Sequence, residues 1–424
     1  MARCTTRRKR RAISVLFSEG SSLSARQALS ALGPLGYQID VCDPNGLCLS
    51  RFSRFIHRFY RSPVFGADPL AYRQFILERL QEDQYDVLLP THDQAFLFAR
   101  IERSLAPRVG IALPAFDRFA RLQSKASFAK VFAEAGIPQP ITRFARSRAD
   151  LEAESDFPYY VKHPYSTAGR GVWRVDNAAR RAGVIRELEA RADLDGRTEL
   201  VIQETATGLQ CQVQTVFEHG SLVAIHCTSQ RSVGMGGSQS ARLSEQHPIV
   251  QTHMTQLGGN LSWHGALAVD YFYDPATNQP LYIEANPRLV EPMNAVLSGV
   301  NLPDILVRLS LGESFRDVGV KSGIAGVRSH SLLATLLGLA AENASRTRIM
   351  REVVQAFLRR GVYAGSREDL TPIWLDPFSL VPLSVGTVAL LWKPSNAEGL
   401  SARTVADYSL TPTAADEICR LEDG

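Results

Sequence analysis

Cysteine is scarce in this sequence and is never paired at short spacing. The 424 residues include six cysteines, and no two of them form a C-x-x-C pair. A disulfide framework or a structural zinc site needs cysteines at short, regular spacing, so neither is expected. We expect free thiols in the reducing environment of the cytoplasm.

Long hydrophobic runs are missing as well. The apolar segment at residues 378–392 contains Pro382 and Gly386, and it is shorter than the roughly 20 residues that a membrane-spanning helix needs. We expect a buried hairpin of helices there, with a membrane-associated element as the less favoured alternative. The apolar run at residues 12–17 is too short for the core of a secretory signal peptide. Membrane contact is therefore not expected.

Neither sign of charge dominates the chain. The 47 basic and 43 acidic residues leave a net charge of +4. The basic residues at 7–11 account for this excess, so the remainder of the chain is close to neutral. We therefore do not expect the globular part to bind nucleic acid. We expect residues 1–11 to form a disordered basic tail. The composition is that of a globular chain with about two to four domains.

Two common phosphate-binding motifs are absent. The loop at residues 19–22, after the first predicted strand, lacks a full G-x-G-x-x-G, so dinucleotide binding there is weakly supported. The glycine-containing loop at residues 165–171 lacks the G-K-[ST] of a P-loop and is followed by a strand pattern rather than a helix.

Strand and helix patterns alternate through residues 12–118. Buried-type strands are predicted at 13–17, 37–42 and 86–90, with helices at 24–32 and 69–81 between them. This order predicts a parallel sheet with right-handed crossovers. Ligands of such sheets bind at the carboxyl ends of the strands.

The loop after the third of these strands contains His92 and Asp93. These residues either cap the next helix or take part in a ligand site at the sheet edge, and the sequence leaves both interpretations open.

A hairpin near residue 277 carries the strongest chemical signal. Strand patterns at residues 266–273 and 279–285 flank a turn rich in Asp, Pro and Asn. If the hairpin is symmetric about Thr277, Asp270 lies directly opposite Glu284, about 4.5–5.5 Å away at Cβ. Two carboxylates so close repel each other unless a positive group lies between them.

Asn286 shares the strand face of Glu284, and Arg288 follows just beyond the strand end. Hard cations such as Mg²⁺ take oxygen ligands and usually share them with substrate phosphates. We therefore predict a cation on Asp270, Glu284 and Asn286, with Arg288 neutralising a phosphate. The alternative is a solvated hairpin with incidental charges.

A carboxylate near the end of one strand, followed by E-x-N-P-R closing the next, resembles the metal site of the ATP-grasp superfamily. The resemblance extends over roughly residues 12–315. It implies a multidomain α/β and α+β fold: a Rossmann-like pre-ATP-grasp domain at 12–118, an ATP-grasp domain at 119–315 with a lid at about 157–205, and a mostly helical C-terminal extension at 316–424. The first domain of such enzymes helps to bind the second substrate.

The resemblance assigns nucleotide-binding roles to residues between 125 and 231. Lys125 opens a helix that ends before G-I-P-x-P, and Lys162 ends a strand that leads into the loop at 165–171. Small residues let backbone N–H groups approach a phosphate, and lysine supplies a point charge. The family usually has an acidic residue after the hinge glycine to hold the ribose, whereas this chain has Gln210 and Gln212. The candidate ATP-binding residues are Lys125, Lys162, Ser166, Gly169, Gly171, Gln203, Glu204, Thr205, Ala206 and Gln212.

Arg231 precedes a glycine-rich stretch that we interpret as a flexible loop. It fits a flap that closes over an acyl phosphate, and it fits a solvent-exposed loop nearly as well. Arg242, further along, has a weaker claim. We therefore name Arg288 and Arg231 as the candidate catalytic residues.

These features together predict an ADP-forming carboxylate–amine ligase of the cytoplasm that uses ATP and Mg²⁺ (or Mn²⁺). Its substrates would be a small-molecule carboxylate and an amine, and a homodimer is possible. One alternative is a bicarbonate-activating enzyme of the carbamoyl-phosphate type, although the duplicated half of that type is absent. Another is a non-catalytic ATP-binding protein. Residues 316–424 show helical patterns at 330–342 and 346–360 but no assignable chemistry.

Overall fold

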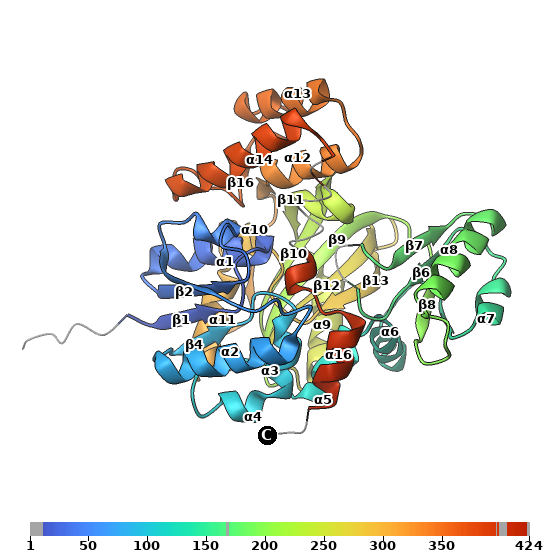
Figure 1. The fold of residues 1–424 in the computed structure, drawn as a ribbon, viewed down its shortest axis with the longest axis horizontal. Coiled ribbons are helices and arrows are strands. Elements are labelled where there is room, and N and C mark those ends of the chain that lie inside the picture. The colour runs from blue at the N-terminus through green and yellow to red at the C-terminus, as the bar shows by residue number, and fades with distance from the viewer. Residues whose placement is uncertain (1–11, 167–168, 396, 398–404, 422–424) are drawn as a thin grey trace, which may run out of the picture.

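The computed structural model describes residues 12–421 except 167–168, 396 and 398–404. The basic tail predicted at residues 1–11 lies outside the described residues. Among the described residues the strands form three sheets. Figure 1 shows the N-terminal sheet in blue, the large sheet in the middle, the sheet of β5–β8 in green, and a lobe of helices α12–α14 at the top.

The N-terminal sheet is parallel, as predicted, with the strand order β3-β2-β1-β4. β1 and β4 are wholly buried. β3 was not predicted, because three of its six residues are exposed and two of those are arginines. The elements of this part are β1 (Ser14–Phe17), α1 (Leu23–Leu32), β2 (Gln38–Asp43), β3 (Ile56–Arg61), α2 (Pro69–Glu82), β4 (Val87–Leu89), α3 (Gln94–Arg100), α4 (Glu102–Leu105) and α5 (Phe116–Gln123).

A small antiparallel sheet with the order β5-β8-β6-β7 follows the helix α6. Its buried face packs on α7 and α8 through a core of its own that includes Tyr159, Trp173 and Leu188. The elements are α6 (Lys125–Glu134), β5 (Thr142–Ala145), α7 (Arg148–Glu152), β6 (Tyr159–Lys162), β7 (Val172–Val175), α8 (Ala178–Ala190) and β8 (Leu200–Glu204). A separate core allows this sheet to act as a unit beside the rest of the molecule.

The large sheet has eight strands and is mostly antiparallel, with the order β13-β12-β9-β10-β11-β15-β16 and β14 beside β10. It therefore extends past the boundary predicted at residue 315. The elements are β9 (Leu209–Glu218), β10 (Ser221–Val233), β11 (Gln239–Glu245), α9 (Pro248–Leu261), β12 (Gly265–Asp274), β13 (Gln279–Asn286), α10 (Met293–Leu297), α11 (Leu302–Ser310), β14 (Lys321–Ser322), β15 (Arg328–His330) and β16 (Ser366–Glu368).

The largest hydrophobic core joins the N-terminal part to the large sheet. It includes Leu16 and Phe96 from the first part together with Trp263, Tyr271 and Tyr282 from the second. The carboxyl ends of the parallel strands are thereby held next to the predicted hairpin of β12 and β13.

Three helices form a lobe beyond the large sheet: α12 (Leu332–Ala341), α13 (Arg346–Phe357) and α14 (Leu380–Trp392). The expected buried hairpin of helices at 378–392 is wrong. After a short 3-10 turn that ends at Ser379, the segment is the single helix α14, and Leu390 is the one buried residue of that helix, because α12 and α13 cover a single side of it. Among the residues that the structure describes, no helix is both long and apolar enough to cross a membrane.

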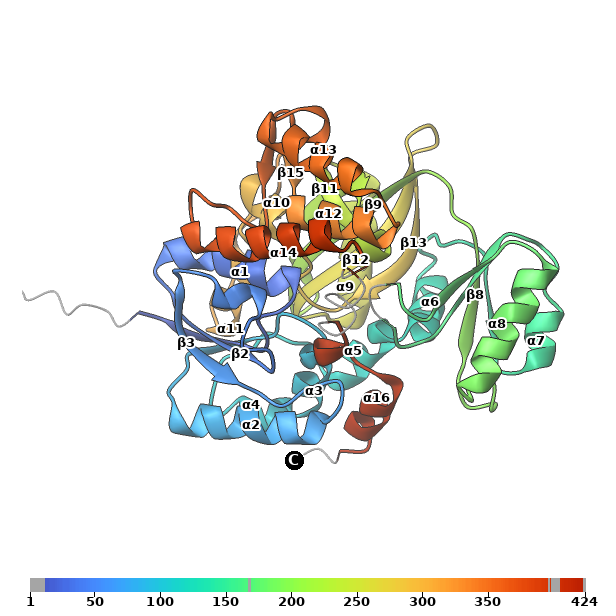
Figure 2. The same cartoon turned by 45° about the horizontal axis from the view of Figure 1, so that its top comes forward.

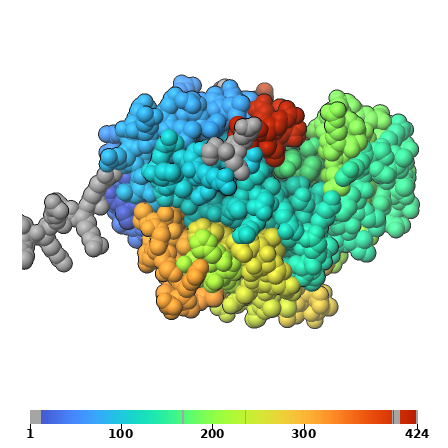
Figure 3. All heavy atoms as spheres, turned by 90° about the horizontal axis from the view of Figure 1, so that it is seen from below, coloured from blue at the N-terminus to red at the C-terminus, as the bar shows by residue number. Residues whose placement is uncertain are grey.

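The chain finally returns to the N-terminal part. The backbone N–H of Gly66 donates to the carbonyl of Asp407 (3.3 Å), and that of Leu410 donates to a carboxylate oxygen of Asp93 (3.1 Å). α16 (Pro412–Cys419) then packs on α2 and α3. Seen from below, this red segment lies between the blue N-terminal part and the green part that contains the sheet of β5–β8 (Figure 3).

Candidate active site

The two acids of the hairpin face each other, as predicted. β12 and β13 pair Asp270 with Glu284. Next to this pair the register shifts, because Tyr271 pairs with Tyr282 and Ile283 is an extra, bulged residue. The carbonyl of Ile283 lies 3.5 Å from Nζ of Lys162.

Amide side chains surround Asp270. Its Oδ1 accepts a hydrogen bond from Nε2 of Gln212 (2.9 Å), and its Oδ2 accepts one from Nδ2 of Asn286 (3.2 Å). Burial, and then the charge of Glu284, raise the pKa of Asp270 to about 7. Crowding of negative charge of this kind is relieved when a cation binds between the acids.

Both candidate lysines reach this hairpin and are nearly buried. Lys125, the first residue of α6, places Nζ 3.1 Å from Oε1 of Glu284 and donates to the carbonyl of Ser166 (2.7 Å). Lys162, the last residue of β6, donates to Oε1 of Gln203 (2.6 Å). Burial lowers the pKa of Lys162 to about 8, although the charge of Glu284 opposes the shift. Two cationic groups are therefore held beside two acids.

The loop between β6 and β7 folds back on itself, as far as it is described. Gly169 and Gly171 both have positive φ angles, +74° and +68°, which favour glycine. A Cβ on Gly169 would lie 3.1 Å from the carbonyl oxygen of Gly236, so the loop lies against the turn that follows β10. A Cβ on Gly171 would lie 3.2 Å from Cβ of Ser166.

The candidate ATP-binding residues Glu204, Thr205 and Ala206 lie at and beyond the end of β8. The carboxylate of Glu204 is 3.6 Å from a guanidinium nitrogen of Arg143, and its backbone N–H donates to the carbonyl of Ile141 (3.0 Å). The hydroxyl of Thr205 donates to the carbonyl of Pro158 (3.2 Å). Thr205 and Ala206 are partly exposed at this edge of the lid sheet.

Gln212, one of the predicted nucleotide-binding residues, lies beside the facing acids. β9 pairs directly with β12, with Gln212 opposite Asp270, and the side chain of Gln212 is therefore used to hold that carboxylate. It belongs to the cluster of acids.

The prediction for Arg231 is wrong in its local structure. The residue lies inside β10, which continues to Val233, and not in a flap loop. Its exposed guanidinium pairs with Glu245 (3.2 Å). The glycine-rich stretch after Arg231 favoured a loop, but pairing with β11 keeps this part of the chain in the sheet up to Val233.

Arg242 on β11 is buried, whereas Arg231 is exposed. It lies opposite Gln230, is 2% exposed, and pairs with the carboxylates of Glu291 and Asp369. Although burial opposes it, the negative charges of Glu291, Asp369 and Asp270 raise the pKa of Arg242 above its usual value. An arginine between the small residues of a buried strand was the available signal in the sequence.

Arg288 links the hairpin to the N-terminal sheet. Its Nε donates to Oδ1 of Asp93 (3.1 Å), and one Nη donates to Oδ1 of Asn286 (3.3 Å). Although burial opposes it, the charges of His92 and Arg288 hold the pKa of Asp93 well below its usual value. The ring of His92 packs on Tyr408, with centroids 4.2 Å apart. Asp93 therefore orients Arg288 and does not cap α3, whose first residue it precedes.

The donor set at the hairpin fits a hard divalent cation. Asp270 and Glu284 offer carboxylate oxygens and Asn286 an amide oxygen, which are the ligands that Mg²⁺ prefers. Among the described residues, no group of three or more His, Cys, Asp or Glu side chains is arranged so that it could hold a metal ion.

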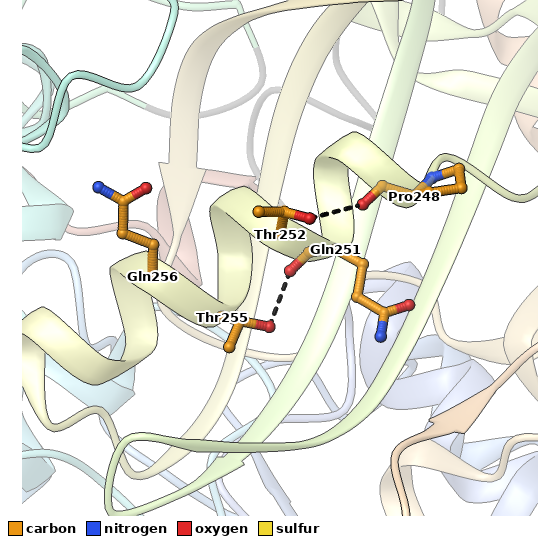
Figure 4. A pocket seen from close by; sticks show the side chains of 5 residues that line it. All are labelled: Pro248, Gln251, Thr252, Thr255 and Gln256. Atoms are coloured by element: carbon orange, nitrogen blue, oxygen red, sulfur yellow. Dashed lines mark hydrogen bonds between the residues drawn. The ribbon is translucent and has the colours of Figure 1, made fainter.

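A hollow of about 600 Å³ on α9 lies outside this cluster. Figure 4 shows its lining of Pro248, Gln251, Thr252, Thr255 and Gln256. The two threonine hydroxyls donate to carbonyls of their own helix, so this surface offers little to a ligand.

No family model matches the chain. Among curated proteins, the large chain of carbamoyl phosphate synthase from Gemmatimonas aurantiaca is 25% identical over 307 residues, which cover 69% of this chain and 27% of that protein. Acetyl-CoA carboxylase 1 of Arabidopsis thaliana is 23% identical over 197 residues, 42% of this chain and 8% of that one. The chain thus spans about a quarter or less of these relatives.

Solved structures match over a larger part of their length. The biotin carboxylase domain of Hydrogenobacter thermophilus 2-oxoglutarate carboxylase superposes with a TM-score of 0.60 at 16% identity, covering 74% of this chain and 72% of that one. L-amino acid ligase from Bacillus licheniformis gives a TM-score of 0.55 at 14% identity, covering 72% and 75%. N5-carboxyaminoimidazole synthetase from Staphylococcus aureus gives 0.56 at 14% identity, covering 75% and 80%. Together with the facing acids of the hairpin, these similarities confirm the predicted resemblance: the chain has the ATP-grasp fold.

Proposed function

We propose that this protein is an ATP-dependent, ADP-forming ligase that activates a small-molecule carboxylate as an acyl phosphate and joins it to an amine. One observation carries the proposal: two nearly buried lysines, Lys125 and Lys162, lie beside the facing acids Asp270 and Glu284, with Lys125 only 3.1 Å from Glu284. Phosphoryl transfer requires mostly positioning and charge neutralisation, and this cluster supplies both.

Asp270, Glu284 and Asn286 would hold a divalent cation, which when bound would neutralise charge on the terminal phosphates of the nucleotide. Lys125 is the counter-ion of Glu284 in the ligand-free arrangement. A cation between the acids would take over that role and let the ammonium group of Lys125 turn to a phosphate. Lys162, whose charged form is disfavoured by burial, would likewise gain a phosphate partner.

Arg288 would stabilise the transferred phosphoryl group and the later tetrahedral oxyanion. Asp93 and Asn286 fix its guanidinium from two sides, so the group is oriented before any substrate arrives. A fixed donor of this kind stabilises a developing oxyanion by about 3–4 kcal/mol. The carboxyl ends of β1 and β4, beside Asp93, would then hold the second substrate.

The lid sheet of β5–β8 would close over the nucleotide. Gly169 and Gly171 would let the backbone of the loop approach phosphates closely, with Ser166 beside them. Glu204, Thr205 and the backbone of Ala206 would contact the adenine. Exclusion of water by the lid would protect the acyl phosphate from hydrolysis.

The division of the strands into separate sheets supports a domain at 12–118 that is distinct from the ATP-grasp domain beginning at about 119, and β6, β7 and β8 of the small sheet lie within the lid proposed at about 157–205. The boundary proposed at 315 has no such support, because the large sheet continues to β16. The five described cysteines are free, which supports a reducing compartment such as the cytoplasm. A biotin carboxylase neighbour forms a dimer, which supports a homodimer.

Bicarbonate is a second candidate for the activated carboxylate. The neighbour with a TM-score of 0.60 is a biotin carboxylase domain solved with MgADP and bicarbonate. The phosphate-binding cluster would serve both reactions, so the distinction lies in the substrate.

The test is a phosphate-release screen with ATP and Mg²⁺ against pairs of carboxylates and amines, with a bicarbonate arm. Release that needs both a carboxylate and an amine supports the ligase, and release with bicarbonate alone favours the second candidate. Glu284→Ala should remove the signal. Glu134→Ala, at an exposed pair with Arg121, is the matched control. Nucleotide binding without phosphate release across the panel would refute catalysis.

A further inference from the structure

Exposed apolar side chains concentrate in one part of this molecule. Among the described residues, 14 of the 24 exposed large hydrophobic side chains lie between Met350 and Trp392. Three aromatic side chains are the most exposed of these: Trp374 is 97% exposed, Phe357 86% and Trp392 80%, and Phe378 is 58% exposed. Scattered surface apolar residues need no explanation, but a contiguous concentration marks an interaction surface.

The exposed side chains follow the helical repeat on α13 and α14. Met350, Val354 and Phe357 are spaced i, i+4 and i+7 on α13, and four exposed residues from Val381 to Trp392 follow the same spacing on α14. The opposite sides of the helices meet α12 in a small core. Each helix therefore has one apolar side packed and a second one exposed.

The two exposed stripes belong to neighbouring elements. α13 packs on α14, and a guanidinium nitrogen of Arg346 at the start of α13 donates to the carbonyl of Trp392 at the end of α14 (2.7 Å). Figures 1 and 2 show α12–α14 as a lobe at one end of the molecule, away from the lid sheet.

The charge around these stripes is almost entirely positive. Between residues 342 and 393, seven basic residues are exposed, among them Arg351, Arg359 and Arg360, whereas Glu342 is the one exposed acidic residue. The buried acids of this region, Asp369 and Asp376, already pair with arginines of the protein body. The outer surface of the lobe is therefore both apolar and cationic.

This combination decides between the possible occupants. A second copy bound through the same face would bring the same arginines against each other, because a two-fold interface pairs identical patches. An anionic lipid surface instead offers negative headgroups to the arginines and a boundary where tryptophan and phenylalanine insert. None of the described helices is long and apolar enough to cross a bilayer, so α13 and α14 would contact the membrane only at its surface.

We propose that residues 346–393, which we call the basic–aromatic face, dock this protein peripherally on anionic membrane surfaces. The face is fixed relative to the candidate active site, because Asp376 forms a buried ion pair with Arg26 of α1 (2.9 Å) and Asp369 one with Arg242 (3.4 Å). Docking therefore presents the catalytic part in one orientation. This inference does not depend on the proposed ligase activity.

The experiment is co-sedimentation of the full chain with vesicles of phosphatidylcholine alone and of phosphatidylcholine mixed with phosphatidylglycerol. We expect binding to the anionic vesicles, weakened by salt, and at most weak binding to the neutral ones. Each basic residue near such a surface is worth about 1 kcal/mol, so Arg359→Glu with Arg360→Glu should weaken binding roughly twenty-fold or more. Trp374→Ala with Trp392→Ala should also reduce it.

Matched controls lie far from the face. Leu47→Ala changes a side chain that is 75% exposed, and Arg197→Glu changes one that is 92% exposed; both should bind vesicles as the unchanged protein does. Trp173 and Trp263 are buried, so a blue shift of tryptophan fluorescence with anionic vesicles would report Trp374 and Trp392.

Three results would overturn the proposal. They are equal binding to both kinds of vesicle, no binding to either, and self-association that the face variants abolish in the absence of lipid. Lys162→Met should leave vesicle binding unchanged. The vesicle experiment therefore tests the docking face independently of the roles proposed for the active-site residues.

Discussion

Replacing Lys162 by methionine should weaken nucleotide binding and yet stabilise the ligand-free protein at neutral pH. Lys162 is 6% exposed, and its Nζ is held by Gln203 and by the carbonyl of Ile283. Burial lowers its pKa from 10.5 to about 8. The folded protein thus holds a charge that its surroundings disfavour, as expected of a group reserved for an anionic ligand.

The pKa shift sets the magnitude and its sign. Below about pH 8 the lysine is protonated in both the folded and the unfolded chain, and the shift of about 2.5 units then reduces the free energy of unfolding by roughly 3 kcal/mol. As the pH rises from about 8 to 10.5, the folded state loses its proton first and this penalty disappears. Methionine removes the penalty but also the hydrogen bond to Gln203, worth about 1–2 kcal/mol. We expect a net stabilisation of about 1–2 kcal/mol at pH 7 that becomes a destabilisation near pH 10.

Urea denaturation of both proteins at the two pH values measures the stability effect, with Trp173 of β7, which pairs with Val161 of β6, as the reporter. Calorimetry with MgADP measures binding. Wild-type affinity should fall up to about tenfold per pH unit above pH 8, with uptake of a proton, whereas Lys162→Met should bind weakly at every pH. Lys130→Met, on the exposed side of α6, is the control. If Lys162→Met bound MgADP as tightly as the wild type, the phosphate role of Lys162 would be refuted.

Three further changes test other parts of the structure. Glu284→Gln should abolish Mg²⁺-dependent phosphate release, because one of the facing acids loses its charge; calorimetry in EDTA should show metal-free ADP binding little changed. Arg288→Lys cannot keep its bond to Asp93, so kcat/KM should fall about 100- to 1,000-fold with ADP affinity nearly constant; equal losses in both would indicate a structural role. Arg26→Met leaves Asp376 buried without its cationic partner and should lower the free energy of unfolding by about 3–5 kcal/mol; in urea denaturation, the double variant with Asp376→Leu should lose less than the two single variants together.

Local patterns in the sequence were sufficient for the parts of the site that lie on single strands or hairpins. Lys162 at a strand end, the loop at 165–171 and the hairpin of Asp270 and Glu284 were all predicted, because apolar alternation and turn residues define such elements over 10–20 residues. That these elements come together in space was predicted from the resemblance to the family. The evidence for it was the order of the motifs along the chain, because no single motif was sufficient.

Contacts between distant segments could not be predicted in this way. Asp93 and Arg288 are separated by 195 residues, and the return of the chain at Leu410 to Asp93 spans 317. No periodicity encodes such pairs, and for that reason the capping interpretation of Asp93 could not be decided. Arg231 was misplaced because the polar end of β10 has no apolar alternation, and its pairing with β11 is what keeps it in the sheet.

The facing of Asp270 and Glu284 was predicted from a symmetric hairpin, but the structure reaches it by another route. At the turn, Asp274 pairs with Gln279, and an unbroken ladder with that register would set Asp270 opposite Ile283. Because successive side chains of a strand point to opposite faces, Glu284 would then lie on the other face of the sheet from Asp270. The bulge at Ile283 restores the register by one residue, and the buried side chains of Tyr282 and Ala285 accordingly stand three apart instead of two. The same bulge sets the carbonyl of Ile283 beside Lys162. The proposed cation site therefore depends on this one extra residue as much as on the acids themselves, and a variant that deletes Ile283 should lose the proposed Mg²⁺-dependent activity while every proposed ligand remains in the chain.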